Sequence, residues 1–384
     1  MAIKLSESQK QLYIAYIDLL ASVLNGEEPP RLPEDFDWDY FCRYAQRNSV
    51  ANILAYSLDK VNIKPSDTVA AVLENDRRYH IIKETSQLVD IEKVIEECEK
   101  SKIKNAPLKG YFMKQLYPRG DFRTMSDIDF LTERKNFKKL EKIFTDLGFE
   151  KRDVIKSAEV HYTKGLLYCE VHSDLNENFD SYYNDIWDRV ELRGGYSYSY
   201  RMKPEDFYIY MIYHAAKHFS HGGIGIRMVM DVYVCLNSFQ NLDFEYINGE
   251  LEKMNLSEFE RAFRSLSLNW FSAEKTEVNE FGEFILYCST FGAREVYFYQ
   301  DGERTGGLYW LKQVFIPLNK LKGKYAYLNK MPFLLPVSWI QYWVKRVFIS
   351  RDLNLKAGFS DRRKNLEGSD AEFVSNLMNE LKIK

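Results

Sequence analysis

Residues 108–131 read LKGYFMKQLYPRGDFRTMSDIDFL, combining a glycine turn, a short helix and an acidic strand. Pro118 ends the helix predicted from Tyr111 to Leu116, because proline lacks the amide hydrogen that a helix interior needs. Beyond it, the alternation of a β-strand places Asp127 and Asp129 on one face and apolar residues on the other. Two neighbouring carboxylates repel each other, and a hard divalent cation with oxygen ligands relieves that repulsion.

A second predicted strand, from Leu166 to His172, carries another carboxylate. Alternation places Glu170 and His172 on the same face of this strand. If it lies beside the strand of Asp127 and Asp129, Glu170 completes an acidic trio that can hold two metal ions about 3.5–4 Å apart. The alternative is a half-exposed sheet face with ordinary surface charges.

Two basic residues lie close to the acidic strand in the sequence. Lys109 precedes Gly110, which stands where a predicted strand turns into a helix, and amide groups at a helix N-terminus attract phosphate. Lys109 either adds a positive charge for the same phosphates or is a solvated surface lysine. Arg123 lies four residues before Asp127, in a segment that must approach the acidic site. The alternative is that Arg123 forms a structural ion pair with one of the many acids.

Two histidines, His214 and His218, are four residues apart and share one face of a predicted helix. This spacing suits zinc, but no third ligand follows from the sequence, and position 215 is Ala215 rather than the Glu of a zinc protease. Histidines beside a substrate cleft are therefore the favoured interpretation. Arg227 and Asp231 have the same spacing, for which an intrahelical ion pair is expected.

The periodicity of apolar residues divides the chain into three regions. We expect a helical region at 1–102, a mixed α/β core at 103–200 and a second helical region at 201–384. The predicted fold class is α+β, a small mixed sheet flanked by N-terminal and C-terminal helical regions. The core strands are predicted near residues 106–108, 127–132, 149–154, 159–163 and 166–172.

Helices outside the core can also be placed from the sequence, including one at Ser369–Lys382 near the C-terminus. Those of the N-terminal region are expected at Ser6–Leu24, Asp37–Lys60 and about Asp76–Lys102. Another, from Pro332 to Trp343, is apolar but too short to cross a bilayer, and a buried helix is favoured over an interfacial anchor.

Composition narrows the class of protein. The chain has 384 residues, 45% hydrophobic content and a formal net charge of −3. It can bury a large core, and its mild acidity provides no general attraction for nucleic acid, although a local basic face is not excluded. Its five cysteines lack paired spacing, and neither a signal peptide nor a membrane span is found. A reduced, cytoplasmic protein is the expectation.

Several ordered blocks resemble the DNA-polymerase-β-type nucleotidyltransferase superfamily, and within it a bacterial family described as uncharacterised nucleotidyltransferases. Residues 108–131 are similar to its central block, and the similarity extends from about Asp37 to Arg346. The other residues that carry it are His161, Glu170-Val171-His172, His214, His218, Arg227, Asp231, Phe333-Leu334-Leu335-Pro336 and Trp339.

The resemblance implies transfer of an NMP group from an NTP to an acceptor hydroxyl, with release of pyrophosphate. Asp127 and Asp129 would hold Mg²⁺ or Mn²⁺ against the triphosphate, and Glu170 would hold the catalytic ion and help to deprotonate the acceptor. Residues implied in nucleotide binding are Lys109, Gly110, Arg123 and Ser126. Possible substrate-site residues are His172, His214 and His218.

Two departures from the superfamily pattern keep other functions open. Tyr111 follows Gly110 where members usually carry Gly or Ser, and sixteen residues separate Gly110 from Asp127, a longer gap than usual. One alternative is a catalytically inactive nucleotide-binding sensor or scaffold with the same fold. Another is an interaction protein, in which the three carboxylates would be dispersed. For an enzyme, a small-molecule or protein acceptor is favoured over RNA.

Overall fold

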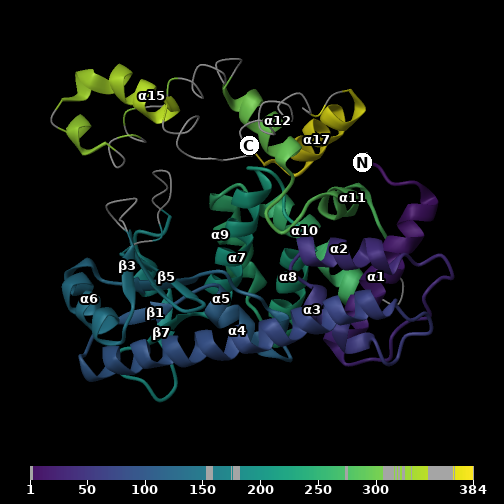
Figure 1. Ribbon diagram of the computed structural model, residues 1–384, viewed down its shortest axis with the longest axis horizontal. Helices are drawn as coiled ribbons and strands as arrows, with labels where there is room; N and C mark the ends of the chain where they lie inside the picture. The colour runs from purple at the N-terminus through teal and green to yellow at the C-terminus, as the bar shows by residue number, and fades with distance from the viewer. Residues whose placement is uncertain are drawn as a thin grey trace.

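The computed structural model describes residues 3–152, 159–173, 175, 182–272 and 276–305, and parts of the chain beyond. Those parts are residues 315, 318, 321, 325–329, 331–344, 366 and 368–383. The fold is α+β, as expected: a mixed sheet lies at one end of the molecule, and helices from both ends of the chain pack at the other (Figure 1).

The main sheet has five strands in the order β1-β2-β5-β4-β3. Their bounds are β1 Asn105–Pro107, β2 Ile128–Thr132, β3 Glu150–Arg152, β4 Glu159–Lys164 and β5 Leu167–His172. The central pair, β2 and β5, is parallel, and the other pairs are antiparallel. Gly165, with a left-handed φ of 53°, makes the predicted turn between β4 and β5.

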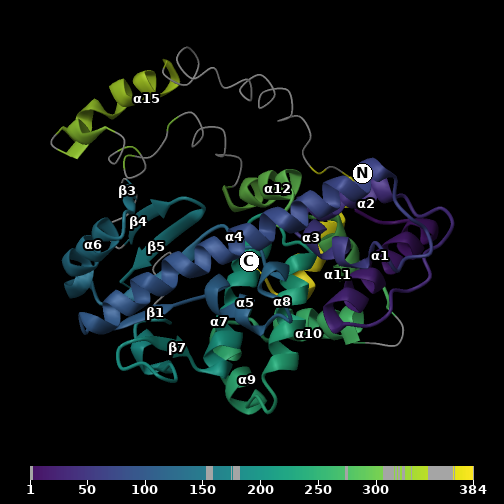
Figure 2. The same ribbon diagram turned by 60° about the horizontal axis from the view of Figure 1, so that its bottom comes forward.

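One face of this sheet is covered by helices α4 (Asp67–Lys100) and α6 (Phe137–Asp146). Figure 2 shows α4 running along the sheet and continuing toward the N-terminal helices. The apolar side chains of β2 and β5 enter this hydrophobic core: Ile128, Phe130, Cys169 and Val171. The predicted alternation is therefore confirmed, and the acidic residues of the two strands lie on the opposite face.

The N-terminal helices agree only partly with the sequence prediction. Helix α1 (Glu7–Asn25) begins at a capping box on Ser6 and ends at the left-handed Gly26, as expected. The single helix predicted over residues 37–60 is wrong, because the chain breaks at Ser49, whose φ is 57°. It forms α2 (Trp38–Arg47), α3 (Ala51–Leu54) and the 3₁₀ helix η1 (Ala55–Ser57). Helix α4 begins at Asp67 instead of Asp76, because Ser66 caps it.

The region after the sheet is mainly helical, but it starts with a small sheet that the sequence analysis missed. That sheet pairs β6 (Val190–Leu192) with β7 (Tyr200–Met202), which are too short to show a periodic pattern. The helices are α7 Pro204–Phe219, α8 Ile226–Ser238, α9 Phe244–Lys253, α10 Ser257–Ser272, α11 Glu280–Tyr287, α12 Arg294–Thr305, α15 Leu335–Val344 and α17 Ser369–Glu380. Side chains from both terminal regions share one hydrophobic cluster.

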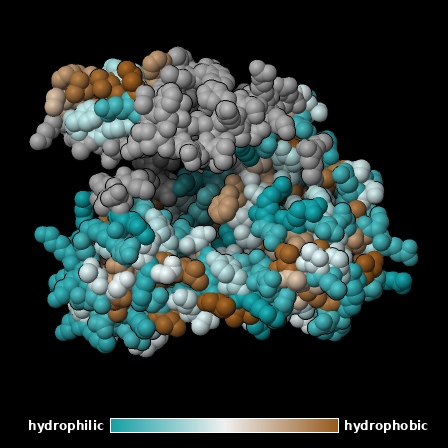
Figure 3. All heavy atoms as spheres, in the orientation of Figure 1, coloured by the Kyte–Doolittle hydropathy of each residue, from teal (hydrophilic) through white to brown (hydrophobic). Residues whose placement is uncertain are grey.

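The predicted apolar helix near residue 335 is present as η6 (Pro332–Leu334) and α15, but the expectation that it is buried is wrong. Phe333 is 75% exposed and Ile340 is 66% exposed. Among the described residues, the helix contacts Phe315 and Tyr327. Figure 1 shows it away from the main sheet, and Figure 3 shows apolar residues on its surface. Among the described helices, none has the length and apolar character needed to span a membrane. All five cysteines are free and buried.

Candidate active site

The acidic residues of the two central strands come together on the open face of the sheet. In the parallel register, Asp129 lies opposite Glu170 and Leu131 lies opposite His172. His172 Nε2 lies 3.1 Å from Asp129 Oδ1 and 3.8 Å from Glu170 Oε2. One ligand atom from each of Asp129, Glu170 and His172 lies within 4.8 Å of the others. The expected adjacency of the strands is therefore confirmed.

Asp127 precedes β2 and stands at the edge of this group rather than within it. Burial raises the pKa of Glu170, and the negative charges of Asp127 and Asp129 raise it further. The three predicted carboxylates are therefore close enough to interact, which contradicts the dispersed arrangement expected of an interaction protein. His172 was expected only as a substrate-site residue. It instead belongs, with Asp129 and Glu170, to the group whose ligand atoms lie within 4.8 Å of one another.

The donor atoms of this group suit a divalent cation. Asp129 and Glu170 offer carboxylate oxygens, the ligands that hard cations prefer, and an imidazole lies beside them. Asp129 is only 6% exposed, so its charge has little access to water. The chemistry of these residues therefore fits a bound Mg²⁺ or Mn²⁺, with Asp127 at the edge as a further oxygen donor.

Lys109 contributes a positive charge to the same place. Its Nζ lies 3.3 Å from Asp129 Oδ2, so the alternative of a solvated surface lysine is wrong. Burial by itself would lower the pKa of Lys109, but Tyr210, Asp129 and Asp127 together raise it. Burial would likewise raise the pKa of Asp129, but Lys109 and His172 hold it well below its usual range. Both groups are therefore charged at neutral pH.

The backbone at Lys109 is unusual for a residue with a side chain, with φ 46° and ψ −111°. Such conformations cost about 1–3 kcal/mol and cluster at functional sites. The next residue, Gly110, begins α5 (Gly110–Leu116), and a Cβ there would approach Met125 Sδ to 2.9 Å. Tyr111 turns into the sheet core and donates to Glu92, so no hydroxyl replaces the usual Ser at this position.

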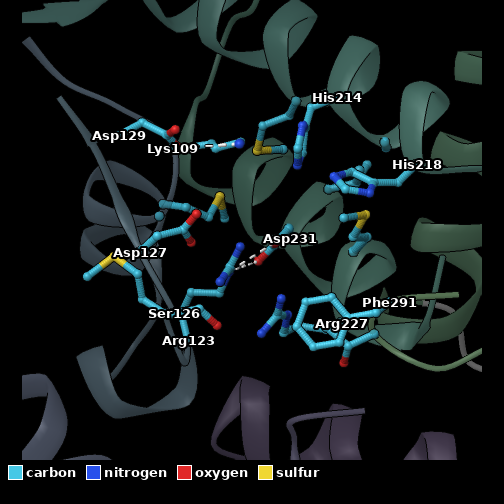
Figure 4. Close-up of a pocket in the computed structure, with 18 of the residues that line it drawn as sticks. Lys109, Arg123, Ser126, Asp127, Asp129, His214, His218, Arg227, Asp231 and Phe291 are labelled. Carbon is cyan, nitrogen blue, oxygen red and sulfur yellow. Dashed lines mark hydrogen bonds and ion pairs between the residues drawn. The ribbon is translucent and has the colours of Figure 1, made fainter. Parts of the chain in front are cut away.

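A cavity of about 260 Å³ opens between the first residues of β2 and helices α7 and α8 (Figure 4). Its lining includes all four residues predicted to bind nucleotide, both aspartates of the acidic strand, and His214 and His218. Glu170 and His172 lie on the neighbouring strand beside Asp129 rather than in its wall. The remaining wall is mainly apolar, and Phe291, which is 78% exposed, stands at its edge.

Arg123 forms an ion pair that the sequence analysis considered only in general terms. Its Nε donates to both carboxylate oxygens of Asp231, at 2.7 and 3.0 Å. Tyr117 also donates to Asp231, at 2.8 Å. The expected intrahelical pair of Arg227 and Asp231 is wrong, because Arg123 takes the carboxylate. Arg227 instead donates to the hydroxyl of Thr124 at 3.0 Å.

His214 and His218 face the cavity with their ring centroids 4.3 Å apart. Burial lowers the pKa of His214 well below its ordinary value and that of His218 to about 4, and the nearby charge of Lys109 adds to both effects. Both rings are therefore neutral at pH 7. Among the described residues they join no group of three potential metal ligands. Both residues line the cavity.

Sequence reasoning missed part of this site. The cavity is also lined by residues that the sequence did not single out: Met113, Met125, Phe207, Met211, Phe263, Thr290 and Phe291. Nothing in their spacing marks them, because they come from segments far apart in the sequence. The one available signal was the resemblance of the Arg227 and Asp231 block, which pointed to the helix but not to the partner of either residue.

A mixed sheet with acidic residues on neighbouring parallel strands, beside a cavity with basic side chains in its wall, is the arrangement of a nucleotidyltransferase core. A family profile described as uncharacterised nucleotidyltransferase matches residues 34–272, and the chain belongs to this family. No curated protein sequence matches the chain.

Two solved structures of the antibiotic-resistance factor ANT(2'')-Ia are similar in part. The solution structure is 12% identical, with a TM-score of 0.36, and the crystal structure with adenylyl-2''-tobramycin is 14% identical, with a TM-score of 0.33. Each similarity covers 47% of this chain and 98% of the other. Both scores are too low to support a functional comparison.

Helix α8 depends on a close approach at its first turn, which gives a test of the site's framework. A Cβ on Gly225 would lie 2.3 Å from Asn48 Oδ1 and 2.7 Å from the backbone carbon of Ser289. We expect Gly225→Ala to lower the free energy of unfolding by about 1–3 kcal/mol, because backbone atoms cannot move aside cheaply. Urea unfolding followed by circular dichroism measures this change.

The matched control is Gly249→Ala in α9, where a Cβ meets nothing within 4 Å. This change should stabilise the protein by roughly 0.5–1 kcal/mol, because alanine is the better helix former. Equal stability of the two variants would contradict the close packing of α8 against residues 288–292.

Proposed function

We propose that the protein transfers an NMP group from an NTP to an acceptor hydroxyl and releases pyrophosphate. The observation that carries the proposal is the register of Asp129 and Glu170 on adjacent parallel strands, with Lys109 beside them at the rim of a cavity. Membership of a nucleotidyltransferase family supports the same chemistry.

Asp127, Asp129 and Glu170 are the residues that we assign to hold Mg²⁺ or Mn²⁺. The bound metal would neutralise phosphate charge and lower the pKa of a coordinated hydroxyl. Lys109, held protonated by the carboxylates around it, would bind phosphate oxygens and balance their charge. Glu170 would accept the proton of the acceptor hydroxyl as its oxygen bonds to the α-phosphorus. The bond from that phosphorus to the β-phosphate oxygen breaks, and pyrophosphate leaves.

The apolar wall and neutral histidines of the cavity bear on the acceptor. The cavity volume of about 260 Å³ lies below the roughly 300–1,000 Å³ typical of sites for drug-sized ligands. A small molecule, or one side chain of a protein, is therefore favoured as the group that enters it. His214 and His218, both uncharged, would offer hydrogen bonds to that group without repelling a cation.

The test is incubation of the purified protein with each α-labelled NTP, Mg²⁺ or Mn²⁺ and a cell extract. We expect label to appear in a new product with release of pyrophosphate, and chelation by EDTA to abolish the transfer until metal is restored. Binding of NTP without turnover would instead support the alternative, an inactive nucleotide sensor. If the protein neither binds NTP nor labels a product, both proposals fail.

A further inference from the structure

Arg227 is a cation in the wall of the cavity whose expected partner is already occupied. It lies in the first turn of α8, one helical turn before Asp231. Asp231 is 7% exposed and is satisfied by Arg123 and by the hydroxyl of Tyr117. Among the described residues, no carboxylate forms an ion pair with Arg227, which donates only to the carbonyl and hydroxyl of Thr124.

The surroundings make an unpaired guanidinium costly at this position. Its Nε is buried and has no hydrogen-bond acceptor among the described residues. Burial lowers the pKa of Arg227 to about 10, and the repulsion of Arg123 contributes to this change. Burial lowers the pKa of Lys83 of α4, and the nearby charge of Arg227 lowers it further. Among the described residues, Asp231 forms its ion pair with Arg123; Asp231 and Asp127 lie near enough to favour the charge of Arg227, but neither forms an ion pair with it.

Figure 4 shows Asp129 and Lys109 at one side of the cavity and Arg227 at the other, with the pair of Arg123 and Asp231 between them. The lining of the cavity also includes apolar side chains such as Met228, which make the surroundings of Arg227 less polar than water. In such surroundings a charge-assisted hydrogen bond is stronger than in water. A guanidinium presents several N–H donors in one plane, which matches the oxygens of a phosphate or carboxylate.

We propose that Arg227 binds an anionic group, phosphoryl or carboxylate, of a ligand that occupies the cavity beside Asp127. The group belongs either to the triphosphate of the NTP or to the acceptor, and the identity of the ligand rests on the proposed function. The binding of an anion by Arg227 does not rest on the proposed function, because it depends only on the charge and geometry of the cavity. The fork of Arg227 selects for a negatively charged ligand over a neutral one.

The first experiment measures binding of inorganic phosphate by titration calorimetry without divalent metal. We expect Arg227→Met to weaken binding at least tenfold, and Arg227→Lys to weaken it less, because lysine keeps the charge but loses the planar fork. Arg43→Met on the exposed face of α2 is the matched control and should stay within twofold of wild type. Unchanged binding in Arg227→Met, or no saturable binding by wild type up to about 10 mM phosphate, overturns the proposal.

Unfolding in urea without ligand separates binding from folding. A structural arginine would destabilise the protein when removed, whereas Arg227→Met should leave the unfolding midpoint unchanged or raise it, since it removes repulsion with Arg123 and Lys83. Loss of phosphate binding together with a lowered midpoint would mean a structural role and would overturn the proposal.

A non-hydrolysable NTP analogue with Mg²⁺ distinguishes the two sources of the anion. If the analogue displaces phosphate and binds at least tenfold more weakly to Arg227→Met, the anion is the triphosphate. If phosphate still binds to the analogue-loaded protein in an Arg227-dependent manner, the anion belongs to the acceptor. Phosphate binding that depends on Arg227 in a protein without transferase activity would leave the anion site intact while refuting the proposed function.

Discussion

Replacing Asp129 by Asn is expected to abolish nucleotidyl transfer, by at least about 10³-fold, equivalent to roughly 4 kcal/mol of transition-state stabilisation. The change removes the carboxylate that faces Glu170 across the parallel strands and that pairs with Lys109. It also leaves the ammonium of Lys109 without its closest counter-charge, so we expect a loss of stability on the order of 2 kcal/mol. Transfer of label from NTP and urea unfolding measure the two effects.

Asp127→Asn separates activity from folding. Among the described residues, Asp127 makes no ion pair. It lines the cavity and lies outside the group formed by Asp129, Glu170 and His172. We expect the same loss of transfer with an unfolding free energy within about 0.5 kcal/mol of wild type. Retained transfer in either variant would refute the assignment of the acidic strand to the catalytic centre. Asp59→Asn, at an exposed position, is the matched control and should change neither quantity.

Replacing Asp231 by Asn is expected to cause a large loss of stability, about 3 kcal/mol or more, because it leaves the buried guanidinium of Arg123 without its counter-charge. Asp231 is 7% exposed and accepts two hydrogen bonds from Arg123. Arg227, one turn away, offers no compensation, since its own charge is also positive. Chemical denaturation measured at several urea concentrations gives the free energy of unfolding.

The same exposed replacement, Asp59→Asn, is the control for this variant. A change in stability of Asp231→Asn no larger than that of the control would show that the ion pair is not buried in solution. Added inorganic phosphate should not restore the lost stability, because an anion at Arg227 cannot replace the carboxylate that Arg123 contacts. Restoration by phosphate would place both guanidinium groups in one anion site.

The faces of the central strands were predictable because a β-strand alternates strictly. Ile128 and Phe130 enter the core with the apolar residues of β5, and Asp129 and Glu170 share the open face. Caps were informative in the same local way, since Ser6 and Gly26 mark the two ends of α1. Such signals depend on a few neighbouring residues, so they can be predicted from the sequence alone.

Errors arose where packing overrides a local pattern. The periodicity of residues 37–60 continues through Ser49, although the chain turns there to fit α2 and α3 into the helical core. The apolar pattern near residue 335 predicted burial, but apolar composition cannot specify what covers a helix. Strands of three residues, such as β6 and β7, are too short to carry a period.

Local sequence patterns were enough to predict the strands and helices of the core, the acidic face of β2 and β5, and the nucleotidyltransferase family. Which charges neutralise one another depends on the tertiary structure. Arg123 and Asp231 are 108 residues apart, and their contact removes the partner that helical spacing assigns to Arg227. Spacing defines geometry within one helix or strand, whereas the pairing of charges depends on the distances that the whole fold creates.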